Sequence, residues 1–371
     1  MNKKAKFSGH ARRVFFKLLG PSRSKALLSN ILSRRYRREI FSFPINAAST
    51  KEVLVIIPER PIEILYQFKN ILSIVSHFRS SSITVFCETS VSLYIKMIPN
   101  IKIIEYISDE MTSFAAESKE YIGELKNTFD LCILLDRNPD LSMLFLVGSI
   151  NVPIRIGFDS AGEYPFLNLR TRSTSKKYIA DKNCMIAELF GKRTESLHMS
   201  VARKTLDEVD YLIKSSHLTI KTGIAGIDIL FFLKNFGESW SENFIDKLQQ
   251  TYHGQIYYYI SEKPKNGEVK WLKMQPIPSF SELTPSRIAA LIFRSDFVIS
   301  GNSILYGFAS ILNLSAVGFF RQEEFDLYCP GTDNLKGFVY KEIPDENCIS
   351  RVLDAVRFFS SNKNQVHFYP K

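Results

Sequence analysis

The sequence predicts an α/β protein made of two halves, each with a largely parallel sheet, preceded by a basic leader. The chain has 371 residues, which is enough for two hydrophobic cores of ordinary size. Short β-branched runs alternate with stretches that are apolar at helical spacing, as in parallel sheets covered by helices. A polar, mixed stretch over 160–218 interrupts this alternation, which then starts again and so indicates a second half.

The leader, residues 1–45, carries the positive charge of the chain. Residues 1–40 hold twelve Lys and Arg against one acid, Glu39, which is +11; because the whole chain carries +10, the remainder sums to −1. Apolar residues recur among the basic ones at spacings that predict amphipathic helices. This pattern favours an anionic membrane surface as partner, with a solvated or core-docked arm as the alternative. No specific nucleic acid is expected, because no recognised binding module follows the basic stretch.

The remaining composition predicts a cytoplasmic protein, attached at most peripherally to the inner membrane face through the leader. No apolar run approaches the ~20 residues of a membrane span, and no signal-peptide pattern is present. The five Cys form no CxxC pair and the six His have no metal-ligand spacing. We therefore expect neither a disulfide framework nor a metal site.

The first half, residues 46–210, begins with a strand over 52–58 that ends in Pro and leads into a helix over 62–78. The same alternation continues along the half. It predicts strands at 82–88, 101–106, 129–136 and 154–159, helices at 90–98 and 140–150, and a mostly helical stretch at 183–215. The two halves join near residues 205–222, and both have Rossmann-like patterns.

The second half, residues 211–345, is predicted to begin with a strand over 227–233, IDILFFL, and a helix over 241–252 with Ser241 as its N-cap. Thr284 followed by Pro285 predicts the start of a further helix. Residues 346–371 form a closing helix and tail. The other predicted strands of this half are 255–261, 296–300, 315–320 and 338–343.

One turn of the second half has the position of a ligand site. The stretch VISGNSILYGFAS, residues 298–310, has the pattern of a buried strand, a polar turn and a helix of small residues. In open α/β sheets, nucleotides and phosphates bind where a strand ends and a helix begins. The turn is therefore a candidate nucleotide site.

Four phrases, taken in order, resemble the bacterial heptosyltransferases of glycosyltransferase family 9. They are VLVIIPERPIEILYQFKNIL, FDLCILLDRNPDLSMLFLVGSINVPIRIGFD, ALIFRSDFVISGNSILYGFASILNLSAVGFF and IPDENCISRVLDAV, and the resemblance covers about residues 52–357. It implies a GT-B architecture, with the acceptor mainly on the first domain and an activated sugar mainly on the second. It also implies an inverting, metal-independent transfer from a nucleotide-sugar to a cell-envelope glycan or lipid-linked acceptor, without a further cofactor.

The resemblance assigns a base to the first half. The family's Gly-Asp pair after the first strand falls here on Ile62 and Glu63, so Glu63 is the candidate base. An acid at the start of a helix also favours the helix dipole, which is the structural alternative. Arg60 and the matching Arg155 of RIGF are the candidates for meeting the acceptor or holding the cleft, and a structural use is the alternative for Arg155.

The resemblance also assigns donor residues to the second half. The family's phosphate-binding Lys falls on Glu238, with Trp240 matching and Lys234 as the nearest replacement cation. The family's second donor stretch falls on the turn with Ser300, Asn302 and Ser303. Because family residues are replaced at three motifs, the alternative to an enzyme is a catalytically inactive, glycosyltransferase-like binding or scaffold protein that has lost the donor site.

Overall fold

The computed structural model describes residues 49–108, 116–159, 165–171, 178–190, 199–274 and 276–361. The predicted leader lies outside these ranges, apart from the isolated residues 23, 24, 26, 27, 30 and 45. Among the described residues, no helix is both long and apolar enough to cross a membrane.

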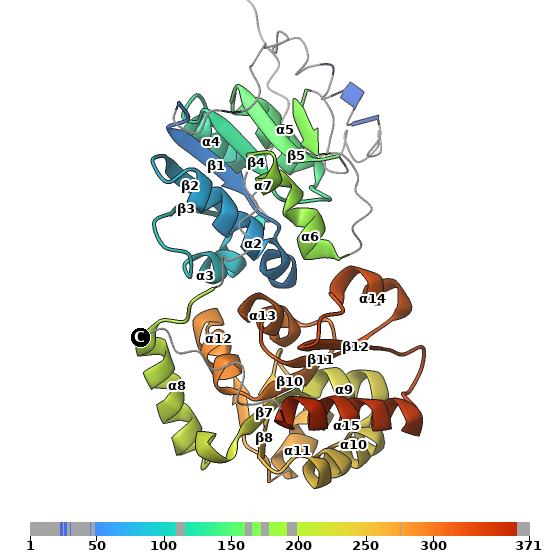
Figure 1. Ribbon diagram of the computed structural model, residues 1–371. Coiled ribbons are helices and arrows are strands. Elements are labelled where there is room, and N and C mark those ends of the chain that lie inside the picture. Colours follow the sequence, from blue (N-terminus) through green and yellow to red (C-terminus); the bar gives the residue numbers. More distant parts are fainter. Residues whose placement is uncertain are drawn as a thin grey trace, which may run out of the picture. The chain divides into compact units, whose positions relative to one another are not determined.

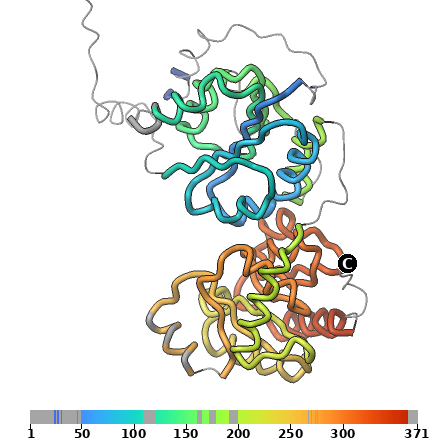
Figure 2. The backbone as a smooth tube through the Cα atoms, turned by 90° about the vertical axis from the view of Figure 1, so that its left-hand side faces the viewer, coloured from blue at the N-terminus to red at the C-terminus, as the bar shows by residue number. Residues whose placement is uncertain are grey.

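The chain divides into two compact units. The first takes Met1–Ser175 with Asn183–Glu195, and the second takes Lys176–Lys182 with Ser196–Lys371. In Figure 2 the first unit runs from blue to green and the second from yellow-green to red. Within the described residues each unit has one six-stranded sheet in which every strand pairing is parallel, so the predicted α/β class is confirmed.

The sheet of the first unit has the order β3-β2-β1-β4-β5-β6. Its strands are β1 (Glu52–Ile56), β2 (Ser82–Glu88), β3 (Lys102–Tyr106), β4 (Leu131–Leu134), β5 (Ile154–Phe158) and β6 (Leu169–Thr171). The helical segments are α2 (Pro61–His77), η1 (Thr89–Val91), α3 (Ser92–Ile95), α4 (Ala116–Leu125), α5 (Leu141–Ser149) and α7 (Met185–Glu188). Figure 1 shows α2 and α7 over one face of this sheet and α4 and α5 over the other.

The sheet of the second unit has the order β12-β11-β10-β7-β8-β9. Its strands are β7 (Ile224–Asp228), β8 (Gln255–Ile260), β9 (Ser279–Ser281), β10 (Phe297–Ser300), β11 (Ala316–Phe320) and β12 (Leu335–Val339). The helical segments are α8 (Arg203–Ser215), η3 (Ile220–Thr222), α9 (Ile229–Phe236), α10 (Glu238–Thr251), α11 (Asn266–Met274), α12 (Pro285–Arg294), α13 (Ile304–Leu312), α14 (Gln322–Tyr328) and α15 (Glu346–Ser361). A short helix, α6 (Ile179–Asn183), lies where the chain passes between the units.

The central strands have the composition that parallel sheets require. β4 and β7 are buried along their whole length, as expected of strands with helices on both faces. An aromatic cluster on α9 and α10 packs on one face of the second sheet. Its members include Phe232, Phe236, Trp240 and Phe244, with Phe319 of β11 beneath them. The ends of the central strands are therefore firmly placed.

The predicted strand over 227–233 is wrong after its first two residues. β7 ends at Asp228 and α9 begins at the next residue. A short, mostly apolar run does not by its periodicity distinguish a strand from a buried helix. Gly237, with a φ of 84°, ends α9 and starts α10. Ser241 is consequently inside α10 and not its N-cap; its hydroxyl donates to the Gly237 carbonyl at 2.7 Å.

The predicted strand over 338–343 starts too late in the sequence. β12 covers Leu335–Val339 and pairs along its length with β11, whose last residue, Phe320, lies opposite Val339. β11 ends at that pair, so residues 340–343 of the predicted strand lie outside the sheet. The predicted start of the helix at Thr284 and Pro285 is confirmed.

Candidate functional site

The carboxyl edge of the second sheet has the geometry of a ligand site. β7, the first strand of this sheet along the chain, lies between β8 and β10. The strands β8 and β9 lie on one side of β7, and β10, β11 and β12 lie on the other. α9 begins at the end of β7, and three residues, 301–303, separate the end of β10 from the start of α13. Open α/β sheets bind ligands at such a switch point. The candidate turn after β10 lies at this edge.

A buried carboxylate, Asp228, stands at the centre of this edge. Asp228 is 1% exposed, and its carboxylate accepts a hydrogen bond from the Ser261 hydroxyl at 3.1 Å. Burial raises the pKa of Asp228 to about 6, against the opposing effect of the Ser261 and Ser303 hydroxyls and the Phe231 amide. The Ser303 hydroxyl is buried and makes no hydrogen bond of standard geometry to any described residue, although it lies close enough to influence Asp228.

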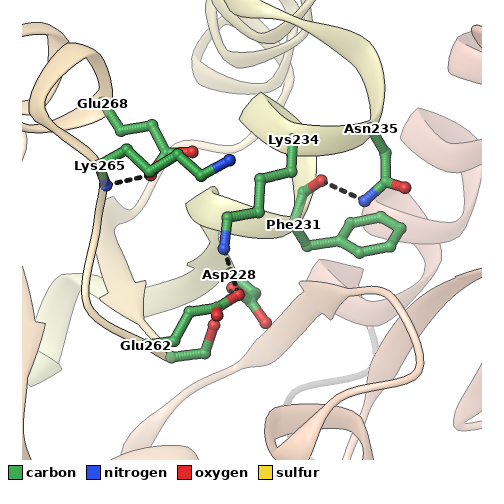
Figure 3. Close-up of polar contacts among 8 residues, drawn as sticks. Asp228, Phe231, Lys234, Asn235, Glu262, Lys265 and Glu268 are labelled. Carbon is green, nitrogen blue, oxygen red and sulfur yellow. Dashed lines mark hydrogen bonds and ion pairs between the residues drawn. The ribbon is translucent and has the colours of Figure 1, made fainter.

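Lys234 points toward the same edge from α9. Its ammonium group forms an ion pair with Glu262, which follows β8, as Figure 3 shows. The Lys234 side chain is 29% exposed and that of Glu262 is 60% exposed. Glu262 also contributes to the raised pKa of Asp228, so the two carboxylates are close enough to repel each other. The cation that the sequence singled out is therefore already paired within the chain.

The ring of Phe231 covers the turn after β10. A Cβ atom at Gly301 would lie 2.2 Å from this ring, so only glycine allows the contact. Phe231 belongs to the first turn of α9, and its carbonyl accepts from the Asn235 side chain at 2.8 Å (Figure 3). The glycine of the turn serves a contact with an aromatic ring of the same unit.

The predicted donor residues divide into two groups. Ser300, Asn302 and Ser303 lie together on the turn after β10, where Ser300 is fully buried and donates to the Gly301 carbonyl at 3.0 Å. Glu238 instead starts α10 and is exposed, as an acid in a first helical turn ordinarily is. Trp240 is part of the aromatic cluster, and its indole donates to the Pro344 carbonyl at 2.9 Å.

In the first unit, Glu63 lies in the first turn of α2, just beyond the carboxyl end of β1. Burial raises the pKa of the Glu63 carboxyl, the nearby Asp136 adds to the rise, and Arg60 opposes it. The Arg60 Nη1 atom lies 3.7 Å from Glu63 Oε1, and the Arg60 side chain is 78% exposed. A half-buried carboxyl of raised pKa at a strand end has the properties of a general base.

Other acids at this edge have identified partners. Glu59 accepts hydrogen bonds from the hydroxyls of Tyr106 and Ser108 at 3.1 and 3.0 Å. Asp136 accepts from the Asn138 amide at 2.8 Å, and Asp140 caps α5 through the Met143 amide at 2.7 Å. Burial raises the pKa of both aspartates. These hydrogen bonds give Glu59, Asp136 and Asp140 structural roles, whereas Glu63 forms a partly exposed ion pair with Arg60.

Arg155 is a structural residue in this fold. It is 1% exposed, and its guanidinium donates to the backbone carbonyls of Val152, Pro165 and Phe166. These bonds hold the segment before β6 against β5. A buried guanidinium occupied in this way is not presented to an acceptor.

Buried amides fix α2, and with it Glu63, relative to the sheet. The Gln67 side chain donates to the Leu135 carbonyl at 2.6 Å and accepts from Asn70 at 3.0 Å. Asn70 in turn accepts from the Ala187 amide at 3.2 Å, while Asn183 donates to the Tyr66 carbonyl at 3.0 Å. Satisfied buried networks of this kind specify one packing arrangement.

Sequence reasoning missed Asp228, Ser261 and Glu262. The available signal was a lone acid, Asp228, inside an otherwise apolar run, together with Ser261 at the end of a predicted strand and Glu262 directly after it. Within the described ranges, no group of three or more His, Cys, Asp or Glu side chains is arranged to hold a metal ion.

Replacing Asp228 with Asn should stabilise the second unit near neutral pH. The folded chain binds the proton of the Asp228 carboxyl more tightly than the unfolded chain does, because the pKa of this carboxyl is about 6 in the fold against its ordinary value of 3.8. Asp228 therefore favours folding below pH 3.8, and that contribution is lost as the pH rises to about 6. The loss is about 3 kcal/mol at most, from about 1.4 kcal/mol per pKa unit.

The stability advantage of Asp228→Asn over the wild type should therefore grow by about 2–3 kcal/mol from about pH 4 to about pH 7. Urea unfolding followed by tryptophan fluorescence measures it, because Trp240 and Trp271 are the only tryptophans and both lie in the second unit. Asp333→Asn, at a side chain that is 98% exposed, is the control. An advantage that does not change with pH would contradict the burial of this charge.

Comparison with known proteins supports the architecture. No family sequence model matches the chain, and no curated protein matches it. A family 9 glycosyl transferase from Veillonella parvula DSM 2008 is similar in structure, with a TM-score of 0.67 and 15% identity over 84% of this chain and 97% of that one. E. coli ADP-heptose LPS heptosyltransferase II has a TM-score of 0.66 and 13% identity over 84% and 99% of the two chains.

E. coli heptosyltransferase WaaC with ADP-2-deoxy-2-fluoro heptose is similar at a TM-score of 0.58 and 13% identity, again over 84% of this chain and 99% of that one. At such low identity the likeness establishes the fold alone. The chain therefore has the GT-B fold, two Rossmann-like units, that is found in glycosyltransferases of family 9.

Proposed function

We propose that this chain is a GT-B glycosyltransferase that moves a sugar from a nucleotide-sugar donor to an acceptor hydroxyl. The observation that carries the proposal is Glu63, a half-buried carboxyl of raised pKa at the amino end of α2. A general base works best when its proton affinity approaches the operating pH. The similar E. coli structures are an ADP-heptose LPS heptosyltransferase and WaaC with ADP-2-deoxy-2-fluoro heptose, and they support a nucleotide-sugar as the donor.

In the proposed reaction Glu63 takes the proton of the acceptor hydroxyl as its oxygen attacks the anomeric carbon. The bond from that carbon to the diphosphate breaks, the nucleoside diphosphate leaves with the electron pair, and the anomeric carbon inverts. Charge that develops on the leaving group needs a cation and hydrogen-bond donors. In the second unit Lys234, Asn302 and Ser303 supply these groups, and the reaction needs no metal ion.

The acceptor we propose is a cell-envelope glycan or a lipid-linked sugar. Arg60 carries an exposed positive charge next to the proposed base, which suits an anionic acceptor. The basic residues 1–40 would keep the enzyme at an anionic membrane surface, on the cytoplasmic side, where lipid-linked acceptors lie. Arg155 has no part in this site.

The alternative is a catalytically inactive binding or scaffold protein. The pairing of Lys234 with Glu262 and the contact of Phe231 with Gly301 favour it, because both occupy groups that a donor would use. Glu238, at the position that aligns with the family's Lys, adds a carboxylate where a cation would be expected. Donor binding and turnover separate the two functions.

Calorimetric titration with ADP, UDP and GDP and their sugar conjugates should reveal saturable binding of one nucleotide. Glu63→Gln should leave that affinity unchanged within about twofold but slow release of the nucleoside diphosphate from the donor about 100-fold or more, since general bases contribute about 10²–10⁴-fold. Glu124→Gln, at an exposed residue of α4, is the control. No binding of any nucleotide at millimolar ligand contradicts the enzyme and favours the inactive alternative, in which the donor site has been lost.

The leader should bind anionic lipid. The full chain should sediment with vesicles that contain phosphatidylglycerol but not with neutral phosphatidylcholine vesicles, and added salt should weaken the binding. A chain without residues 1–40 should lose it, because twelve basic residues are removed at about 1 kcal/mol each near such a surface. Equal binding by the shortened chain would show that the leader is not the membrane contact.

A further inference from the structure

We infer that Glu262 limits ligand binding in the second unit by occupying Lys234 as an internal competitor for phosphate. The inference rests on the proposed function, in which Lys234 neutralises the diphosphate of the donor. It adds a determinant of affinity that belongs to this chain.

The geometry of α9 brings Lys234 to Glu262. Side chains on a helix lean toward its amino terminus, so a lysine in the last turn of α9 reaches back to the carboxyl edge of the sheet. Figure 3 shows its ammonium group directed at Glu262, beside Asp228. An ammonium makes the same charge-assisted hydrogen bond with a carboxylate oxygen as with a phosphate oxygen. A bound phosphate and Glu262 therefore compete for one group.

The charges at this edge act in the same direction. With both acids ionised, Asp228, Lys234 and Glu262 sum to −1. Asp228 is 1% exposed, so its charge is poorly screened by water. Neutralising Glu262 would bring the sum to zero and release Lys234 at the same time. Both effects favour an anionic ligand.

The effect is specific to Glu262 among neighbouring acids, and the chain offers a matched control. Glu268, in the first turn of α11, accepts from the Lys265 amide at 2.7 Å and so caps its own helix (Figure 3). Glu268→Gln removes the same charge as Glu262→Gln from the same side of the unit. It leaves the ion pair of Lys234 in place.

The test is calorimetric titration of the full chain with inorganic pyrophosphate and with ADP, UDP and GDP. Glu262→Gln should bind pyrophosphate at least about threefold more tightly than the wild type, as expected when a partly exposed ion pair ceases to compete. Adding Lys234→Met to Glu262→Gln should remove the gain. Glu268→Gln should stay within about twofold of the wild type. Circular dichroism and tryptophan fluorescence verify that each variant is folded.

Each outcome decides the inference separately from the proposed function. Equal gains in Glu262→Gln and Glu268→Gln would reflect overall charge and overturn it. Nucleotide binding to the wild type with no gain in Glu262→Gln would overturn the inference and leave the proposed function standing. A Lys234-dependent gain for pyrophosphate with no nucleotide bound by any variant would support the inference and overturn the proposed donor site. No pyrophosphate binding to Glu262→Gln would overturn the inference.

Discussion

The direct passage from strand to helix at Asp228 is the constraint on which the second unit's site depends. Because β7 ends and α9 begins without a loop, a carboxylate is buried at the centre of the sheet edge. The same passage places Phe231 against Gly301 and directs Lys234 back to Glu262. A longer connection would leave room for backbone amides to surround a phosphate. Here Phe231 of α9 lies against Gly301 and Lys234 is paired with Glu262, so under the proposed function an incoming anion competes with groups of the chain itself.

Sequence reasoning predicted the class of the fold and most strands, because fully buried parallel strands leave compact β-branched runs bounded by turn residues. It failed at 227–233, where the strand and the helix share one apolar run that only the lone acid Asp228 interrupts. It also placed the last strand too late, since the end of β12 is fixed by its partner β11 and not by its own sequence. Both errors concern information carried by neighbouring strands.

The positions of the candidate residues could be predicted from the sequence, but the partners of their side chains could not. The turn at 300–303 was found because strand ends are visible in the sequence, and Glu63 was found through the family resemblance; the structure places both after strands of their sheets. The engagement of Lys234 by Glu262, and of Arg155 by three backbone carbonyls, depends on contacts between distant residues. Long-range partners of this kind cannot be read from one chain without its fold.

Hydrogen–deuterium exchange of the full chain with ADP-, UDP- and GDP-sugars tests the central claim most directly, because it locates a ligand without assuming its chemistry. The account predicts that one donor slows exchange at the amides of 229–235 and 300–306, which flank the switch point of the second sheet. No protection by any donor would contradict a donor site at this edge. Protection confined to the surface hollow on α8 and α12, lined by Lys204, Asp207, Glu208, Tyr211, Leu212 and Arg287, would contradict it equally.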